Sequence, residues 1–187
     1  MRAKQPSRSF WLRHVWLLLL VAAMFHVATV WLLPRAIMWR VMSGPMLQDL
    51  GGSNHAGFAP PVDASARRIV MPSPDLLYSI CLLDLSHGPV RVSADPQWPD
   101  YWSLALYAAN SDNFFVLNDR QAAGKPVNLL VHGPGAAFVT SASSAWQVVS
   151  PSGKALLLMR VLTSDYSAQA QAVEKARRSL RCEAVQP

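Results

Sequence analysis

Residues 69–90, IVMPSPDLLYSICLLDLSHGPV, decide the fold because they place a long apolar run between two sharp turns. Pro72-Ser-Pro-Asp precedes the run, and His87-Gly-Pro follows it. Apolar residues dominate positions 77–85, and the turn residues at both ends bound a segment of strand length. We therefore expect a buried strand here, and we expect the following residues to form the sheet with which it pairs.

Short apolar runs bounded by turn residues recur through the rest of the chain. They predict strands at 68–71, 77–85, 90–93, 101–108, 114–117, 127–131, 147–149 and 156–162. The residues 155–159 lack polar–apolar alternation, which fits a strand covered on both faces or a helix, and nearby β-branched residues favour the strand. Long helical periods are missing here, which argues against a doubly wound α/β sheet. The predicted fold class is α+β and β-rich, with an antiparallel, sandwich-like sheet.

Residues 167–182 have a different character, because helix-forming residues replace the strand-like runs. Ser164 or Ser167 can cap this predicted C-terminal helix. The basic residues near its end are Arg177, Arg178 and Arg181. They suit the negative end of the helix dipole. We interpret them as a solvated helix end, with a docking patch for lipid or protein as the alternative.

Residues 15–33 form the strongest local signal, an uncharged run of nineteen mostly apolar residues. As a helix, this run spans about 28 Å, close to the roughly 30 Å hydrocarbon core of a lipid bilayer. Basic residues precede it, so the positive-inside rule places residues 1–14 in the cytoplasm and exports the rest. We expect a single-pass, uncleaved anchor. The alternative is cleavage near Ala28, which the bulky residues Trp31 and Leu32 disfavour.

Residues 34–66 are predicted to connect the anchor to the globular domain. Pro34 is expected to end or kink the helix, and residues 35–42 can then lie as a short interfacial helix. Passages rich in glycine, proline and serine follow, so the remainder is interpreted as a linker. The globular domain is expected to begin at residue 67 and to run to residue 187.

The positive charge belongs to the N-terminal flank and not to the domain. The formal net charge is +6, but six basic residues and no acidic ones lie in the first forty positions. The remaining residues carry eleven basic and eleven acidic side chains. A nucleic-acid-binding domain needs positive charge on its own surface. The charge distribution therefore excludes nucleic acid as a partner.

Sequence motifs for catalysis or cofactor binding are missing. The chain has no P-loop, nucleophile elbow or zinc-protease motif, and Gly133-Pro-Gly lacks the third glycine of a dinucleotide-binding loop. His87 and His132 each stand beside a Gly-Pro turn and can be neighbours in space. No ligand spacing supports a metal site around them. We predict neither a cofactor nor a metal.

The two cysteines lie far apart in the sequence. Cys81 falls on the predicted strand, and Cys182 falls at the end of the predicted helix. In an exported domain the two thiols can oxidise and close a loop of about a hundred residues. Alternatively, Cys81 is a small buried hydrophobe, because Ile80 and Leu82 flank it. The pair is a candidate disulfide, and both interpretations stay open.

Three motifs within residues 70–117 resemble the DUF1254 family, a group of bacterial proteins of unknown function. They are Pro72-Ser-Pro-Asp-Leu-Leu-Tyr-Ser79, Leu83-Asp-Leu-Ser-His-Gly-Pro-Val90, and Tyr101-Trp-Ser-Leu-Ala-Leu106 leading to Asn113-Phe-Phe115. The later His132-Gly-Pro-Gly turn is similar to one in the same family. Ser73, Leu76 and Ala108 or Ala109 stand where the family pattern has Asn, Thr and Asp. If those polar residues carry activity in relatives, this chain has lost part of it.

The resemblance also implies a partner. Family members often continue into a second domain, DUF1214, whereas this chain ends after the first, so a separate DUF1214-type protein is the expected partner. Two functions stay open. The first is a non-enzymatic, membrane-anchored periplasmic subunit at the bacterial inner membrane. The second is a hydrolase-like enzyme of the cell envelope, with a site near Asp75, Tyr78, His87 and Asn113.

Overall fold

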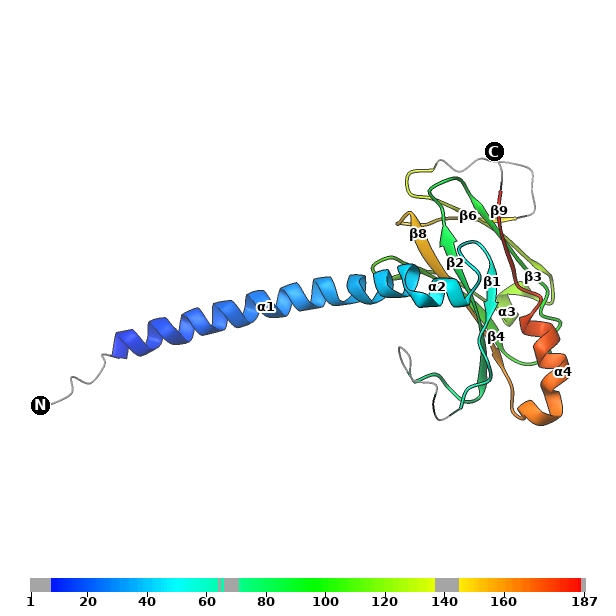
Figure 1. Cartoon of the computed structure of the whole chain (residues 1–187), viewed down its shortest axis with the longest axis horizontal. Helices are drawn as coiled ribbons and strands as arrows, with labels where there is room; N and C mark the ends of the chain where they lie inside the picture. Colours follow the sequence, from blue (N-terminus) through cyan, green and yellow to red (C-terminus); the bar gives the residue numbers. More distant parts are fainter. Residues whose placement is uncertain (1–7, 64, 66–70, 137–144, 186–187) are drawn as a thin grey trace, which may run out of the picture. The chain divides into compact units, whose positions relative to one another are not determined.

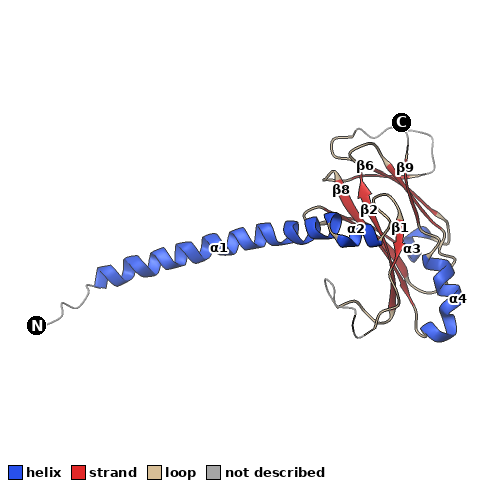
Figure 2. Cartoon of the chain, in the orientation of Figure 1, coloured by secondary structure: helices blue, strands red, loops and turns tan. Residues whose placement is uncertain are grey.

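The computed structural model describes residues 8–63, 65, 71–136 and 145–185 (Figure 1). The chain divides into two compact units, Met1–Ile37 and Met38–Pro187. The described part of the first unit is helical, and the second unit holds all the described strands (Figure 2). The predicted strand at 68–71 lies outside the described residues, apart from Met71, which is not in a strand.

The secondary structure of the described residues consists of four helices and nine strands. The helices are α1 (Arg8–Ser43), α2 (Pro45–Asp49), α3 (Asp119–Ala122) and α4 (Tyr166–Arg177). The strands are β1 (Ala56–Phe58), β2 (Leu76–Asp84), β3 (Val90–Ala94), β4 (Trp102–Ala108), β5 (Asn113–Asn118), β6 (Val127–His132), β7 (Trp146–Val149), β8 (Lys154–Leu162) and β9 (Arg181–Ala184).

Helix α1 continues through Pro34, so the predicted end of the helix at this residue is wrong. Proline removes one backbone hydrogen bond from a helix. One turn of side-chain bonding lies beside it, where Arg35 Nη1 donates to the Trp31 carbonyl oxygen at 2.6 Å. Among the described residues, one helical stretch, Phe10–Asp49, is long enough to cross a membrane and contains an 18-residue segment with a mean hydropathy of 2.2. A signal sequence meets the same criterion.

The strands form two sheets. The five-stranded sheet has the order β1-β2-β8-β4-β5, and the four-stranded sheet has the order β7-β6-β3-β9. Neighbouring strands run antiparallel, except that β6 and β7 are parallel. The structure therefore confirms the predicted α+β, β-rich fold class and adds one parallel pair to it.

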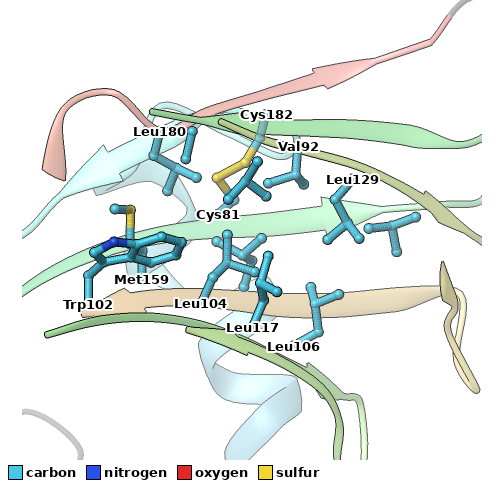
Figure 3. Packing of buried hydrophobic residues seen from close by; sticks show 14 of the residues in the cluster. Cys81, Val92, Trp102, Leu104, Leu106, Leu117, Leu129, Met159, Leu180 and Cys182 are labelled. Atoms are coloured by element: carbon cyan, nitrogen blue, oxygen red, sulfur yellow. A yellow bond between two sulfur atoms is a disulfide. The ribbon is translucent and has the colours of Figure 1, made fainter. Parts of the chain in front are cut away.

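The main hydrophobic core lies between the two sheets. Val92 and Leu129 of the four-stranded sheet are buried in one cluster with Leu104, Leu106 and Leu117 of the five-stranded sheet. Figure 3 shows these side chains meeting between the two layers. Interdigitated apolar side chains of this kind are the main stabilising contribution in a β-sandwich.

Strand β8 alternates between the core and the opposite face of its sheet. Ala155, Leu157, Met159 and Val161 are fully buried, and the residues between them are half-buried. The strand predicted here is confirmed. The sequence shows no alternation because apolar residues are needed on both faces, one for each of two hydrophobic clusters.

The second cluster covers part of the outer face of the five-stranded sheet, which is the face turned away from the main core. Met38, Val41 and Met42 lie at helical spacing near the end of α1 and pack with Leu82 of β2. Strand β1 then pairs with β2. The ordered domain thus begins before the predicted boundary at residue 67. Part of the predicted linker belongs to the domain because its apolar residues cover an apolar sheet face.

The C-terminal helix is shorter than predicted, and a strand follows it. Asp165 caps α4 instead of either predicted serine, because its carboxylate accepts a hydrogen bond from the Ala168 backbone N–H at 3.2 Å. Strand β9 pairs with β3 and places Cys182 opposite Val92. Cys182 therefore lies on a strand and not at the end of a helix. This extended segment lets Leu180 and Cys182 reach the core.

A disulfide joins Cys81 of β2 to Cys182 of β9, with the two Cα atoms 6.6 Å apart. It links the two sheets through the core (Figure 3). The sequence separation of 101 residues makes the closed loop long. A long closed loop restricts the unfolded chain strongly, so the bond favours the folded state.

Arg177 connects α4 to the five-stranded sheet. Only 2% of its surface is exposed, so the predicted solvated helix end is wrong for this residue. Its Nη1 donates to the carbonyl oxygens of Ala59 at 2.5 Å and Tyr78 at 3.1 Å. Its Nε donates to Glu174 Oε1 at 2.8 Å. The buried guanidinium therefore has partners on two neighbouring segments of the chain.

The carboxyl of Glu174 has a lowered pKa. Burial alone would raise the pKa, but hydrogen bonds from Arg177 and Arg178 favour the ionised form more strongly. The folded pKa therefore lies below the ordinary value of 4.5 that applies to the unfolded chain. The ionised carboxylate contributes stability above that value, and the contribution is lost as the pH falls through the folded pKa.

We predict that removal of the disulfide destabilises the domain. The double variant Cys81→Ala, Cys182→Ala should lower the free energy of unfolding by about 2–5 kcal/mol. Urea denaturation of the full-length chain in detergent, followed by tryptophan fluorescence, measures this difference. An unchanged urea midpoint in the double variant would show that the crosslink contributes nothing to stability.

We also predict that Glu174→Gln lowers the free energy of unfolding by about 1–3 kcal/mol at pH 7, because the hydrogen bonds to an ionised acceptor weaken. The difference from the wild type should shrink as the pH falls below 4.5, where protonation removes the same charge. Denaturation at pH 7 and at pH 3 measures both values. Glu183→Gln, an exposed position on β9, is the control. A Glu174→Gln effect that is independent of pH would contradict this account.

Candidate functional site

The residues proposed from the sequence as a catalytic site do not come together. Asp75 precedes the first residue of β2, and His87 follows its last residue. The nine residues of β2 span about 30 Å. Tyr78 lies near the Asp75 end. Asn113 begins β5, which is separated from β2 by two other strands.

Two of these four side chains hold local structure, and a third residue, Asp75, takes part through its backbone. The Tyr78 hydroxyl accepts a hydrogen bond from the Ser73 backbone N–H at 2.9 Å and holds the turn before β2. The Asp75 carbonyl oxygen accepts one from the Thr163 N–H. Asn113 Nδ2 donates to the Leu106 carbonyl oxygen at 3.3 Å, beside the register shift between β4 and β5.

The turn after β2 is fixed by Asp84. Its Oδ1 accepts hydrogen bonds from the Ser86 backbone N–H at 3.0 Å and from the Ser86 hydroxyl at 2.5 Å. The Ser86 hydroxyl is the main reason why the pKa of Asp84 lies below its ordinary value, with burial opposing it. His87 in the same turn is exposed. Asp84 thus fixes the backbone at the end of the strand.

His132 ends β6 and is buried, with 8% of its surface exposed. Its Nε2 has no hydrogen-bond partner among the described residues. Because Val131 pairs with Val90, the register brings His132 beside Pro89, two residues along the chain from His87. Within the described ranges, no group of three or more His, Cys, Asp or Glu residues is placed to hold a metal ion.

A different set of polar residues does come together, on the outer face of the five-stranded sheet. Arg160 of β8 lies between Tyr78 of β2 and Ser103 of β4. Ser103 in turn pairs with Asn118 of β5. Residues directly opposite one another in a sheet point to the same face. We call these four residues the Arg160 row.

The alternation of the strands places this row on the outer face. Leu77, Leu104 and Met159, which adjoin members of the row in sequence, all point into the main core. Successive side chains of a strand point to opposite faces. The Arg160 row therefore crosses the sheet on the face that also carries the second hydrophobic cluster.

Two members of the row each have one buried polar atom without a hydrogen-bond partner in the described part of the chain. Ser103 is fully buried, and its hydroxyl has no hydrogen-bond partner among the described residues. The same holds for Nε of the half-buried Arg160. By contrast, the Asn118 side chain caps α3 by accepting from the Gln121 N–H at 3.0 Å. Unpaired buried polar groups are costly, so this pair is chemically the least satisfied part of the face.

Apolar positions border the row on both sides. Leu162 and Tyr101 lie on one side, and Leu158, Ala105 and Val116 lie on the other. Tyr101 is 41% exposed and Val116 is 44% exposed. The face thus combines one arginine, an aromatic ring and aliphatic surface, which is the composition of a protein-binding surface more than of a catalytic pocket.

The sequence analysis did not identify this surface. Arg160 is the one charged residue inside the otherwise apolar run 155–162, and that interruption was an available signal. Its neighbours in space, Tyr78 and Ser103, are distant in the sequence. Only the pairing of β8 with both β2 and β4 shows that they belong together.

Residues 53–184 match the family described as "Protein of unknown function (DUF1254)". No curated protein matches the chain. Two solved structures are similar in fold. One, the VPA0106 protein from Vibrio parahaemolyticus, is 16% identical with a TM-score of 0.62 over 84% of this chain and 37% of its own. The other, an uncharacterized protein from Burkholderia cenocepacia, is 17% identical with a TM-score of 0.47 over 81% of this chain and 39% of its own.

This chain therefore spans well under half the length of either solved chain. The family match covers both the sheet motifs that suggested the resemblance and the strands that follow them. At 16% identity the VPA0106 structure supports the fold and not an activity. The chain belongs to the DUF1254 family, whose function is unknown.

Proposed function

We propose that this chain is a non-enzymatic, membrane-anchored subunit of the bacterial cell envelope. In this proposal α1 anchors the chain in the inner membrane with its N-terminus in the cytoplasm. The β-rich domain lies in the periplasm and binds a DUF1214-type protein.

The anchor and the periplasmic location are supported by two properties of the chain. The apolar helical stretch at the N-terminus has the length and composition of a membrane span, and basic residues precede it. The domain also contains a disulfide between Cys81 and Cys182. Disulfides persist in oxidising compartments such as the bacterial periplasm and are rare in the cytosol.

The proposal of a protein partner rests on a solved structure in which this fold is only one part of a longer chain. In the VPA0106 protein the matching region makes up 37% of the chain, so further polypeptide adjoins it there. The resemblance to DUF1254 proteins implies that a DUF1214 domain is such a neighbour. We infer that here a separate DUF1214-type protein takes that position against the domain.

The positions of the candidate catalytic residues favour a binding subunit over an envelope hydrolase. Acid–base catalysis requires its groups within hydrogen-bond reach of one substrate. Asp75 and His87 lie beyond opposite ends of β2, and Tyr78 and Asn113 hold local backbone geometry. The four residues on which the hydrolase alternative depends are therefore not arranged around one substrate.

Co-purification tests this proposal. The full-length chain, isolated from the membranes of its own host in a mild detergent, should bring a DUF1214-domain protein with it at about equal amounts. Mass spectrometry identifies the protein and its stoichiometry. Recovery of the folded chain alone and monodisperse would contradict the proposal.

Two variants provide controls for that measurement. Asp75→Ala and His87→Ala should leave the recovered amount of partner unchanged, because both residues lie in turns beyond the ends of β2 and not on a sheet face. A loss of partner in the His87 variant alone would place the contact at the β2–β3 turn.

A further inference from the structure

The proposed membrane span of α1 carries its two polar side chains on one face. His26 and Thr29 are the polar residues of the apolar run 15–33. Residues three and four apart in a helix lie on the same face, so Ala22 joins them there. We call Ala22, His26 and Thr29 the His26 face. The opposite side of the helix holds a shallow apolar groove, lined by Leu20, Ala23, Met24, Val27, Ala28 and Trp31.

The polar side chains of α1 differ in how their hydrogen-bonding groups are satisfied. The Thr29 hydroxyl donates to the Phe25 carbonyl oxygen at 2.8 Å, and His14 Nδ1 hydrogen-bonds the Phe10 carbonyl oxygen at 2.7 Å. Neither ring nitrogen of the exposed His26 has a partner among the described residues. A bond to its own helix, like that of His14, would satisfy one nitrogen and leave the other unpaired.

The depth of His26 makes an unpaired nitrogen costly in a bilayer. It lies seven residues before Leu33, the end of the apolar run, and therefore about 10 Å inside the hydrocarbon region. No water is available there to hydrogen-bond a polar group. Ionisable residues within membrane spans therefore face other helices and not lipid. Among the described residues α1 is the one helix suited to span a membrane, so that helix belongs to another molecule.

The same depth identifies the molecule. A partner for the imidazole must carry a polar group at the level of His26. A second copy of this chain does so, because the basic residues before the run orient every copy in the same direction. A neutral imidazole has one donor and one acceptor, so the histidines of two copies are complementary. Ala22 and Thr29 are small, which lets the two helix backbones approach closely.

We propose that two copies of this chain pair through the His26 faces of their membrane spans. One His26 imidazole donates a hydrogen bond and the other accepts it, with Ala22 and Thr29 of both copies in contact on either side. This inference rests on the proposed function, since it requires the membrane anchor. It adds a self-association in the membrane to the binding of the periplasmic domain to its partner.

Disulfide crosslinking in native membranes tests which face of the span is paired. The two natural cysteines are bonded to one another, so Ala22→Cys gives the full-length chain a single free thiol. Oxidation should convert this variant to a crosslinked dimer on non-reducing gels. Ala28→Cys is the matched control, because Ala28 lies in the groove on the opposite side of the helix. It should form little dimer.

Dissociation constants test the role of the histidine itself. In a mild detergent, His26→Leu should weaken self-association of the full-length chain by about threefold to twentyfold, the range that interhelical hydrogen bonds give. His26→Asn keeps a donor and an acceptor and should retain most of the affinity. Met24→Leu, on the opposite side of the helix, should change it less than twofold. Sedimentation equilibrium gives the constants.

Three results would overturn the inference. They are a monomeric wild type, equal dissociation constants for the wild type and His26→Leu, and equal crosslinking from positions 22 and 28. A crosslink from position 22 to a different protein, without a dimer, would also overturn it and assign the His26 face to that protein.

The failure of this inference is distinguishable from the failure of the proposed function. An anchored monomer that still brings the DUF1214-type protein with it would leave the proposed function standing. A dimer through position 22 without that protein would support the inference and contradict the proposed partner. Release of the chain from membranes by alkaline carbonate would remove the anchor, and both would fail together.

Discussion

The register between β2 and β8 determines which side chains face the core and which face outward. Nine consecutive pairs, from Leu76 with Leu162 to Asp84 with Lys154, hold these strands together at the centre of their sheet. A shift by one residue would turn every side chain of a strand to the opposite face. The buried disulfide, the second hydrophobic cluster and the Arg160 row all depend on this one alignment.

The two faces of that sheet pack against different parts of the protein. The inner face packs on the four-stranded sheet and carries Cys81, whose bond to Cys182 secures the C-terminal strand. On the outer face, residues 38–50 cover the end of the sheet around Leu82. Around Arg160, the side chains of Tyr101 and Val116 stay exposed, whereas the Arg160 Nε and the Ser103 hydroxyl are buried. The same alternation that builds the core therefore also leaves part of the outer face exposed.

The sequence predicts the parts of this structure that local patterns determine. Apolar runs between turns located the longer strands, and the motifs of residues 70–117 indicated the family. Strands β1 and β9 were missed because each is very short and is stable only through pairing with a distant strand.

The prediction of the catalytic site failed for a related reason. Residues close in sequence, such as Asp75 and His87, lie far apart along an extended strand, whereas Arg160 meets distant residues through strand pairing.

Photo-crosslinking in living cells tests the central claim, that the outer face of the five-stranded sheet contacts the partner. A photoreactive amino acid replaces Tyr101 or Val116 in the full-length chain, and Arg91 on the other sheet serves as the comparison. The account predicts crosslinks to the DUF1214-type protein from positions 101 and 116 and none from position 91. Crosslinks from position 91 alone would contradict it, because the contact would then lie on the four-stranded sheet.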